Sequence, residues 1–309
     1  ISNSDGTVID VVSYDDGNGW PIEADGNGYA LVLCDPASDN NAASSWGLEP
    51  ATFRSSGYFG SPGVANICRP PVVYQTYPIS TVRTVDSDGE ADSNGVKCYL
   101  HGVVITPSYR GVGRGYEFHM NDNSSPLNGI NVINFSGSDY VPRVGDSVKV
   151  FGLIDTYNGH VQIKTEQDSI WVLDSNRTVP MPMPVSKLDE TTESKLLRMD
   201  QWEIIDTTGW PTSNFGNYDI TNGTDTVTMR MDGDRDWRNK MPIPPLGKFC
   251  FIGVGGQFDR TAPHFEGYQI SPRDTNDFIM CPMPCPMPTE IAISDTTNEG
   301  GTVTWTSNG

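Results

Sequence analysis

The chain has 309 residues, of which 36% are hydrophobic, and a formal net charge of −19 at pH 7. This length allows two or three domains, and abundant Gly, Asp, Asn, Ser and Thr suits short strands joined by turns. No apolar run approaches the ~18 residues that cross a bilayer, which excludes membrane insertion by a helix. The negative charge argues against a nucleic-acid partner, since a protein that neutralises phosphates needs the opposite balance.

The cysteine count indicates an oxidising compartment, so we expect an extracellular or cell-surface location. The six cysteines are Cys34, Cys68, Cys98, Cys250, Cys281 and Cys285. Cys34 ends a predicted strand and Cys68 ends the same domain, so we predict a disulfide between them. Cys281 and Cys285 are left to pair with each other or with Cys250. The chain starts without Met inside what reads as a strand, so we expect a processed chain or a piece of a longer one.

Residues 1–69 form the first predicted unit, with strands at 7–13 and 29–34. Several dipeptides in order resemble the closing half of a lamin-tail domain. They are Trp20-Pro21, Asp35-Pro36, the Glu-Ala-Asp-Gly motif at 23–26, Asp39-Asn40-Asn41, Trp46 and the Ser-Pro-Gly-Val-Ala-Asn motif at 61–66. The resemblance implies an immunoglobulin-like β-sandwich that is incomplete in this chain. In bacterial secreted proteins such a domain is an accessory module without catalytic residues.

Two similar segments follow, each about 100 residues long. Strand patterns at 96–106 and 145–164 return at 196–205, 247–253 and 268–270, which indicates two tandem copies of one all-β unit, 78–176 and 177–280. In the first copy, strands at 96–106, 115–121, 129–135, 145–154 and 159–164, with a crossover at 140–144, predict a five-stranded OB-fold. The second copy adds a hairpin at 218–231 across Asn222-Gly223.

The first copy also resembles the OB-like domains that follow lamin-tail domains in large secreted bacterial proteins. The motifs are Val-Arg-Thr-Val-Asp at 82–86, Gly-Val-Lys-Cys at 95–98 and Gly-Asp-x-Val-x-Val-x-Gly at 145–152. The resemblance implies export by type IX secretion. It also implies O-glycosylation at Asp-Ser/Thr triplets, although so short a triplet also occurs by chance; the acceptors would be Ser147, Ser169, Thr207, Thr226 and Thr296. After a proline-rich linker, 289–309 alternates like the start of an immunoglobulin-like or fibronectin-like domain.

The sequence offers little catalytic chemistry, so we do not expect an enzyme. The four histidines match no metal-binding spacing, and neither a nucleophile elbow nor a P-loop is found. Asp155 and Lys164 resemble part of a nuclease site, but Gln162 stands where a second acid is needed. Calcium is the one cofactor suggested, by Asp86, Asp88 and Asp92 around Gly89, with a polar surface turn as the alternative.

Loops between the first two strands of each OB-like unit hold aromatic residues, in the first unit beside arginines. They are Tyr109, Arg110, Arg114 and Tyr116 in the first unit and Trp210, Phe215 and Tyr218 in the second. Such residues bind single-stranded nucleic acid or sugars, while simple loop packing is the alternative.

These observations predict a non-catalytic structural or adhesive segment of a large modular surface protein. Its partners would be neighbouring copies of itself or other surface proteins, with strand complementation into a filament as one form of assembly. The alternative is a nucleic-acid- or glycan-binding accessory module of a secreted nuclease or other hydrolase.

Overall fold

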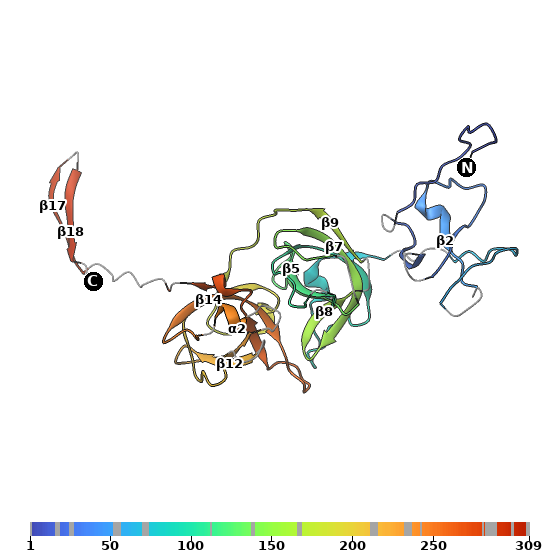
Figure 1. Cartoon of the computed structure of the whole chain (residues 1–309). Helices are drawn as coiled ribbons and strands as arrows, with labels where there is room; N and C mark the ends of the chain where they lie inside the picture. The colour runs from blue at the N-terminus through green and yellow to red at the C-terminus, as the bar shows by residue number, and fades with distance from the viewer. Residues whose placement is uncertain are drawn as a thin grey trace.

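A computed structural model describes most of the chain and confirms an all-β fold with very little helix (Figure 1). The described residues are 2–15, 19–24, 28–51, 57–69, 74–111, 113–136, 140–165, 169–210, 216–231, 237–241, 243–279, 281, 289–297 and 300–306. No helix in these ranges is long and apolar enough to span a membrane.

The strands fall into four groups along the chain. A small N-terminal sheet holds β1 (Leu31–Leu33) and β2 (Trp46–Leu48), and a C-terminal hairpin holds β17 (Thr289–Thr297) and β18 (Gly300–Thr306). Two seven-stranded sheets lie between them. The first holds β3 (Thr76–Tyr77), β4 (Lys97–Val104), β5 (Tyr116–Asn121), β6 (Gly129–Asn134), β7 (Ser147–Tyr157), β8 (His160–Lys164) and β9 (Ile170–Asp174). The second holds β10 (Met183–Pro184), β11 (Leu196–Ile204), β12 (Gly216–Thr221), β13 (Thr226–Met231), β14 (Phe249–Gln257), β15 (Tyr268–Ser271) and β16 (Phe278–Ile279).

Each large sheet closes into a five-stranded barrel. In barrel 1 the order is β4-β5-β6-β8-β7, and β7 pairs with β4 to close the cylinder. Barrel 2 repeats this order as β11-β12-β13-β15-β14, closed by the pairing of β11 with β14. Two strands run parallel in each barrel, β6 with β8 in barrel 1 and β13 with β15 in barrel 2. The other paired strands within each barrel are antiparallel. This is the strand order that the OB-fold prediction requires.

Alternating side chains explain why these segments form barrel strands. In β4 the pattern of exposure places Cys98, Leu100 and Val104 inside barrel 1, where they meet Phe118 and Ile154 in one core. Barrel 2 has its own core, built around Trp202 and Phe251. Each such apolar side chain contributes about 1.5–3 kcal/mol on burial. The short helix α1 (Ile79–Val82) adds Ile79 and Val82 to the core of barrel 1, and a second short helix, α2 (Trp237–Lys240), lies between β13 and β14.

The N-terminal segment is less regular than the sequence predicts. Residues 7–13 form no strand, only an isolated bridge between Ser2 and Val8, whereas the predicted strand at 29–34 is β1. The described part of this segment therefore shows a two-stranded sheet rather than two packed sheets. The predicted disulfide between Cys34 and Cys68 is present and ties the segment's end to β1. A second disulfide joins Cys250 to Cys281, while Cys285 lies outside the described residues.

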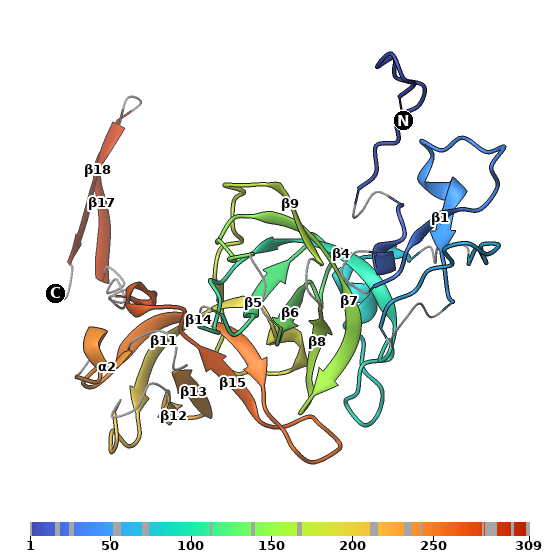
Figure 2. The same cartoon turned by 45° about the vertical axis from the view of Figure 1, so that its right-hand side comes forward.

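A buried ion pair joins the two barrels, which the sequence predicts only as modules on a proline-bearing linker. Arg83 of barrel 1 donates from Nη1 to Glu193 Oε2 of barrel 2 at 2.7 Å, and both side chains have zero exposure. Its Nη2 lies 3.2 Å from Glu190 Oε1. Removing one partner of such a pair typically costs about 3–5 kcal/mol, because the other charge stays buried. The barrels therefore form one unit (Figure 2).

Ser194 continues the barrel interface beside this pair. Its Oγ lies 3.0 Å from His119 Nδ1 and 3.1 Å from His160 Nε2, and the two imidazole rings stack at 5.6 Å. Its carbonyl oxygen accepts from Asn121 Nδ2 at 2.9 Å. A side chain at Gly129 would place Cβ 2.2 Å from that same carbonyl oxygen, so the close approach of the barrels requires glycine there.

The C-terminal hairpin stands apart from the barrels in both views (Figures 1 and 2). Its two strands pair antiparallel, and the side chains of Ile293 and Val303 are 67% and 51% exposed. The hairpin lies where the sequence predicts strands, and its assignment to a further domain stays a prediction.

The burial of these carboxylates predicts a pH-dependent stability. Burial raises the pKa of Glu193 to about 8, an effect that Arg83 opposes and the Glu190 carboxylate reinforces, and burial also raises the pKa of Glu190. A carboxyl whose pKa is raised on folding stabilises the fold below its unfolded value of 4.5, and this stability is lost as pH rises through about 8. We expect a slope of at most ~1.4 kcal/mol per pH unit from this group in urea unfolding.

Glu193→Gln should flatten this pH dependence, because the amide does not titrate. Glu266→Gln, which changes an exposed carboxylate, is the matched control and should keep the wild-type profile. Parallel profiles for wild type and Glu193→Gln would contradict the assignment.

Candidate functional site

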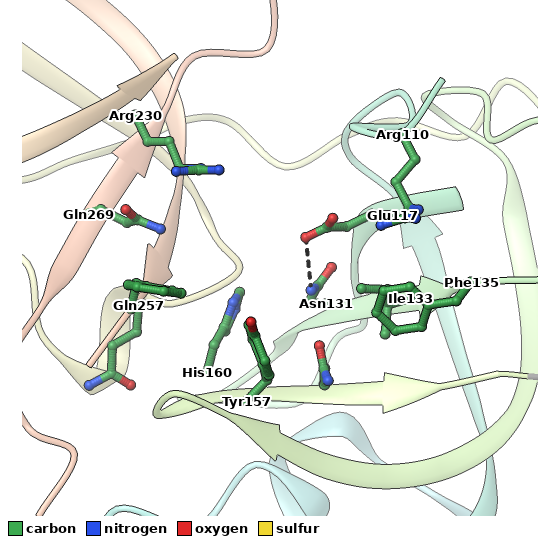
Figure 3. A pocket seen from close by; sticks show the side chains of 12 residues that line it. Arg110, Glu117, Asn131, Ile133, Phe135, Tyr157, His160, Arg230, Gln257 and Gln269 are labelled. Carbon is green, nitrogen blue, oxygen red and sulfur yellow. Dashed lines mark hydrogen bonds between the residues drawn. The ribbon is translucent and has the colours of Figure 1, made fainter. Parts of the chain in front are cut away.

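A cleft lies where the two barrels meet, and side chains from both line it (Figure 3). Its volume is about 330 Å³, at the small end of the range for ligand pockets. The lining residues are Arg110, Glu117, Asn131, Ile133, Phe135, Tyr157, His160, Gln162, Arg230, Gln257, Phe258 and Gln269. A smaller neighbouring hollow shares Glu117, His160, Arg230 and Gln269 with it.

Barrel 1 supplies the face on which OB-folds bind polymers. Glu117 lies on β5 and Asn131 on β6, the second and third strands of this barrel. Arg110 comes from the loop between the first two strands, and Tyr157 and His160 flank the turn between the last two. Strands two and three with these two loops form the ligand face of OB-folds.

Barrel 2 covers one side of this face. Arg230 lies on β13, Gln269 on β15, and Gln257 ends β14. The turn after Tyr157 is fixed against this wall, because Asp259 N donates to Asn158 O at 2.8 Å. A Cβ at Gly159 would lie 2.3 Å from Gln257 Oε1, so the turn approaches barrel 2 as closely as glycine allows.

Three aromatic rings line the cleft while remaining open to solvent. Phe135 is 58% exposed, Tyr157 59% and Phe258 41%. Tyr157 and Phe258 come from different barrels, and their ring centroids lie 6.3 Å apart. A guanidinium lies over two of these rings, Arg110 over Phe135 at 4.7 Å and Arg260 over Phe258 at 5.0 Å, and the exposed parts of the three rings present apolar surface to a ligand.

The charge of the cleft differs in sign from that of the chain. Arg110 and Arg230 oppose one carboxylate, Glu117, among the lining residues. His160 is neutral there, because burial, then His119 and Arg83, hold its pKa well below the ordinary value. The cleft therefore has a small positive balance within a protein of net charge −19.

Among the described lining residues, two buried polar atoms lack a hydrogen-bond partner, Asn131 Oδ1 and Gln257 Oε1. Asn131 is 2% exposed, and its Nδ2 donates to Glu117 Oε1 at a long 3.4 Å. Its Oδ1 makes no hydrogen bond to any described residue. A buried acceptor without a donor costs roughly 1–3 kcal/mol, so this oxygen favours a ligand that brings a donor.

The predicted loop residues of barrel 1 divide into two groups. Arg110 lines the cleft, Tyr109 lines the neighbouring hollow, and Arg114 is exposed nearby, accepting from Arg110 Nε through its main-chain oxygen at 2.8 Å. For Tyr116 the prediction of a ligand-binding loop residue is wrong. It is 1% exposed on β5, and its hydroxyl lies 2.7 Å from Thr165 Oγ1, because the alternation of β5 turns it into the core.

The two described loop residues of barrel 2, Trp210 and Tyr218, are buried and do not form an open ligand surface. Trp210 and Tyr218 are 8% and 6% exposed, and they pack on each other with centroids 4.7 Å apart. Trp210 Nε1 donates to Met241 O at 3.0 Å, so these rings close the end of the barrel. Trp210 and Tyr218 therefore fit the alternative that these loop residues only pack. Phe215 lies outside the described residues.

The acidic loop proposed for calcium serves as a turn that contacts barrel 2. Asp86 Oδ1 accepts from the amides of Asp88 and Glu90, and Asp88 O accepts from His264 N at 2.8 Å. Nowhere in the described ranges do three or more His, Cys, Asp or Glu side chains gather as a metal site, Asp92 included.

The five triplet positions differ in accessibility. Thr207, Thr226 and Thr296 are exposed and Ser147 is half-buried. Ser169 is 4% exposed, so a glycan cannot reach it in the folded chain, which corrects that position.

Most cleft residues were not among the predicted ones. His119 on β5 and His160 on β8 are far apart in sequence and stack only when barrel 1 closes. One signal was present: Gln162 and Gln269 occupy the same position of the repeated short strand, each beside the third strand of its barrel. Both line the cleft.

Comparison with known proteins does not identify a family for this chain. No protein-family model matches the chain, and no curated protein does. Among solved structures, it is similar to one described as the crystal structure of the tetrameric p202 HIN2. The two share 12% identity with a TM-score of 0.27, over 60% of this chain and 91% of that one. The OB-like class therefore follows from the strand order of the two barrels.

Calcium binding at Asp86, Asp88 and Asp92 remains a prediction with a direct measurement. If the ion binds only the folded chain, a chelator should lower the melting temperature, by an amount set by the free calcium and its affinity. Asp88→Asn should then melt at the chelated temperature with calcium present. Equal melting with and without chelator would leave the polar-turn interpretation.

Proposed function

We propose that this chain is a non-catalytic adhesive segment of a modular extracellular protein, and that the cleft between its barrels binds a glycan. The observation that carries the proposal is the cleft lining, where exposed aromatic rings alternate with amide and charged side chains from both barrels. Sugars need this combination, because their rings have apolar faces and their hydroxyls both donate and accept hydrogen bonds.

Nucleic acid is the weaker candidate for the same surface. Stacking rings would suit bases, yet the first unit holds seven basic against twelve acidic residues and the second eleven against fifteen. A phosphate polymer meets repulsion over about one Debye length, ~8 Å at physiological salt. Two arginines in the cleft would neutralise about two phosphates, which gives weak affinity.

The wider context belongs to the same proposal. The residues of 1–69 that resemble a lamin-tail domain, and the two disulfides, favour a secreted multidomain protein of the kind exported by type IX secretion. Assembly with neighbouring copies by strand complementation is a second candidate, favoured by the hairpin β17–β18 with its exposed Ile293 and Val303.

Titration of the purified chain with a glycan panel and with single-stranded DNA, at low and physiological salt, tests the binding proposal. We expect glycan binding that persists at physiological salt and DNA binding that does not. Tyr157→Ala and Phe258→Ala should each weaken glycan binding by about tenfold, in line with the ~1–1.5 kcal/mol of an aromatic contact.

Tyr58→Ala is the matched control, since Tyr58 is 64% exposed but belongs to the N-terminal segment. Submicromolar DNA binding at physiological salt, abolished by Arg110→Ala with Arg114→Ala, would overturn the proposal and favour the nuclease-accessory alternative.

A further inference from the structure

We infer that the cleft selects a glycan whose bound end carries a single carboxylate, that is, a sugar acid. Arg110 and Arg230 supply the cationic donors, and Asn131 with Glu117 accepts from sugar hydroxyls. This inference rests on the proposed glycan-binding function and adds the class of sugar.

The two guanidinium groups enter the cleft from different barrels. Figure 3 shows Arg230 extending from barrel 2 toward the space that Glu117 and Asn131 face from barrel 1, with Arg110 beyond them. Guanidinium groups bind carboxylates with paired, charge-assisted hydrogen bonds, which are about twice as strong as neutral ones. Neutral sugars do not need two such groups in one small site.

Each arginine is held in position by its own barrel. Arg110 lies over the Phe135 ring at 4.7 Å and uses Nε to bond Arg114 O, which leaves its terminal nitrogens for a ligand. Arg230 Nη1 donates to Asn217 Oδ1 at 3.3 Å on the neighbouring strand β12. A guanidinium already fixed in this way loses less freedom when the carboxylate binds.

The lining of the cleft also presents hydrogen-bond acceptors that a ligand could satisfy with donors. Asn131 Oδ1 is buried without a partner, and the Glu117 carboxylate only accepts. A ligand that satisfies this lining must bring an anion for the arginines and hydroxyl donors for the acceptors. A sugar acid has both on one ring, whereas the DNA backbone brings anions without hydroxyl donors along the chain.

The overall charge limits the ligand to few negative groups. With a net charge of −19, the protein repels a polyanion before contact, while a single carboxylate faces little of that repulsion and meets the positive balance of the cleft. The small volume agrees with recognition of one end of a glycan rather than a long stretch of it.

Isothermal titration of the full chain with four probes tests the inference: lactose, 3′-sialyllactose, a disaccharide ending in glucuronic acid, and sodium acetate. We expect at least one acidic sugar to bind about tenfold or more tightly than lactose, the gain of one charge-assisted pair. Acetate should bind more weakly than that sugar, since it has no hydroxyls for Asn131 and Glu117.

Variants of Arg230 then test whether the preference for acidic sugars comes from the cleft. Arg230→Gln should remove the preference for the acid, and Arg230→Lys should keep only part of it because the paired geometry is lost. Arg177→Gln, an exposed arginine outside the cleft paired with Asp174, is the matched control and should bind as wild type. Thermal unfolding of each variant verifies that it is folded.

The outcomes separate the two proposals. Lactose and both acidic sugars binding equally would overturn the sugar-acid inference and leave glycan binding in place. Acetate binding as tightly as the acidic sugars would reduce the cleft to an anion site and overturn the sugar assignment. No binding by any sugar, here or in the wider panel, would overturn the proposed function itself.

Discussion

The cleft depends on one buried contact between the barrels, the ion pair of Arg83 with Glu193. Burying this pair is costly, as the raised pKa of Glu193 reflects, and the contact at 2.7 Å between Arg83 Nη1 and Glu193 Oε2 offsets part of that cost. Apolar packing of Ile105 against Leu196 and Val254 excludes water from the same interface. Together these contacts set the barrels at one separation, and that separation defines the cleft.

The fold class was largely predictable because strands have local sequence signals. Alternation in β4 and the Asn222-Gly223 turn depend on neighbours in sequence, and the repeat of a short Gln-centred strand revealed two copies of one unit. The cleft was not predictable in the same way. The sequence predicted Arg110 as a loop residue. Arg230 lies on a strand, and its role in the cleft follows only from the way barrel 2 packs against barrel 1.

The aromatic residues show why type and spacing alone could mislead. Tyr116 and Trp210 look like binding residues in a glycine-rich loop, yet one turns into a barrel and the other closes its end. Tyr157 ends β7, and Phe135 and Phe258 directly follow β6 and β14; all three line the cleft and stay exposed. Whether an aromatic ring packs or binds depends on which side of the closed sheet it faces, and this is decided by strand register.

The disulfide between Cys250 and Cys281 has a consequence for a chain held under tension between neighbours. Force arriving from the C-terminal side reaches Cys281 and passes through the covalent bond to β14, a strand inside barrel 2, so that the short edge strand β16 carries little of it. On the N-terminal side the pull reaches β3, which pairs with β4 and packs Tyr77 on the core of barrel 1 but has no covalent cross-link to the barrel. Stretching would therefore separate β3 from β4 of barrel 1 first. In barrel 2 the load is carried by β14, which pairs with three other strands.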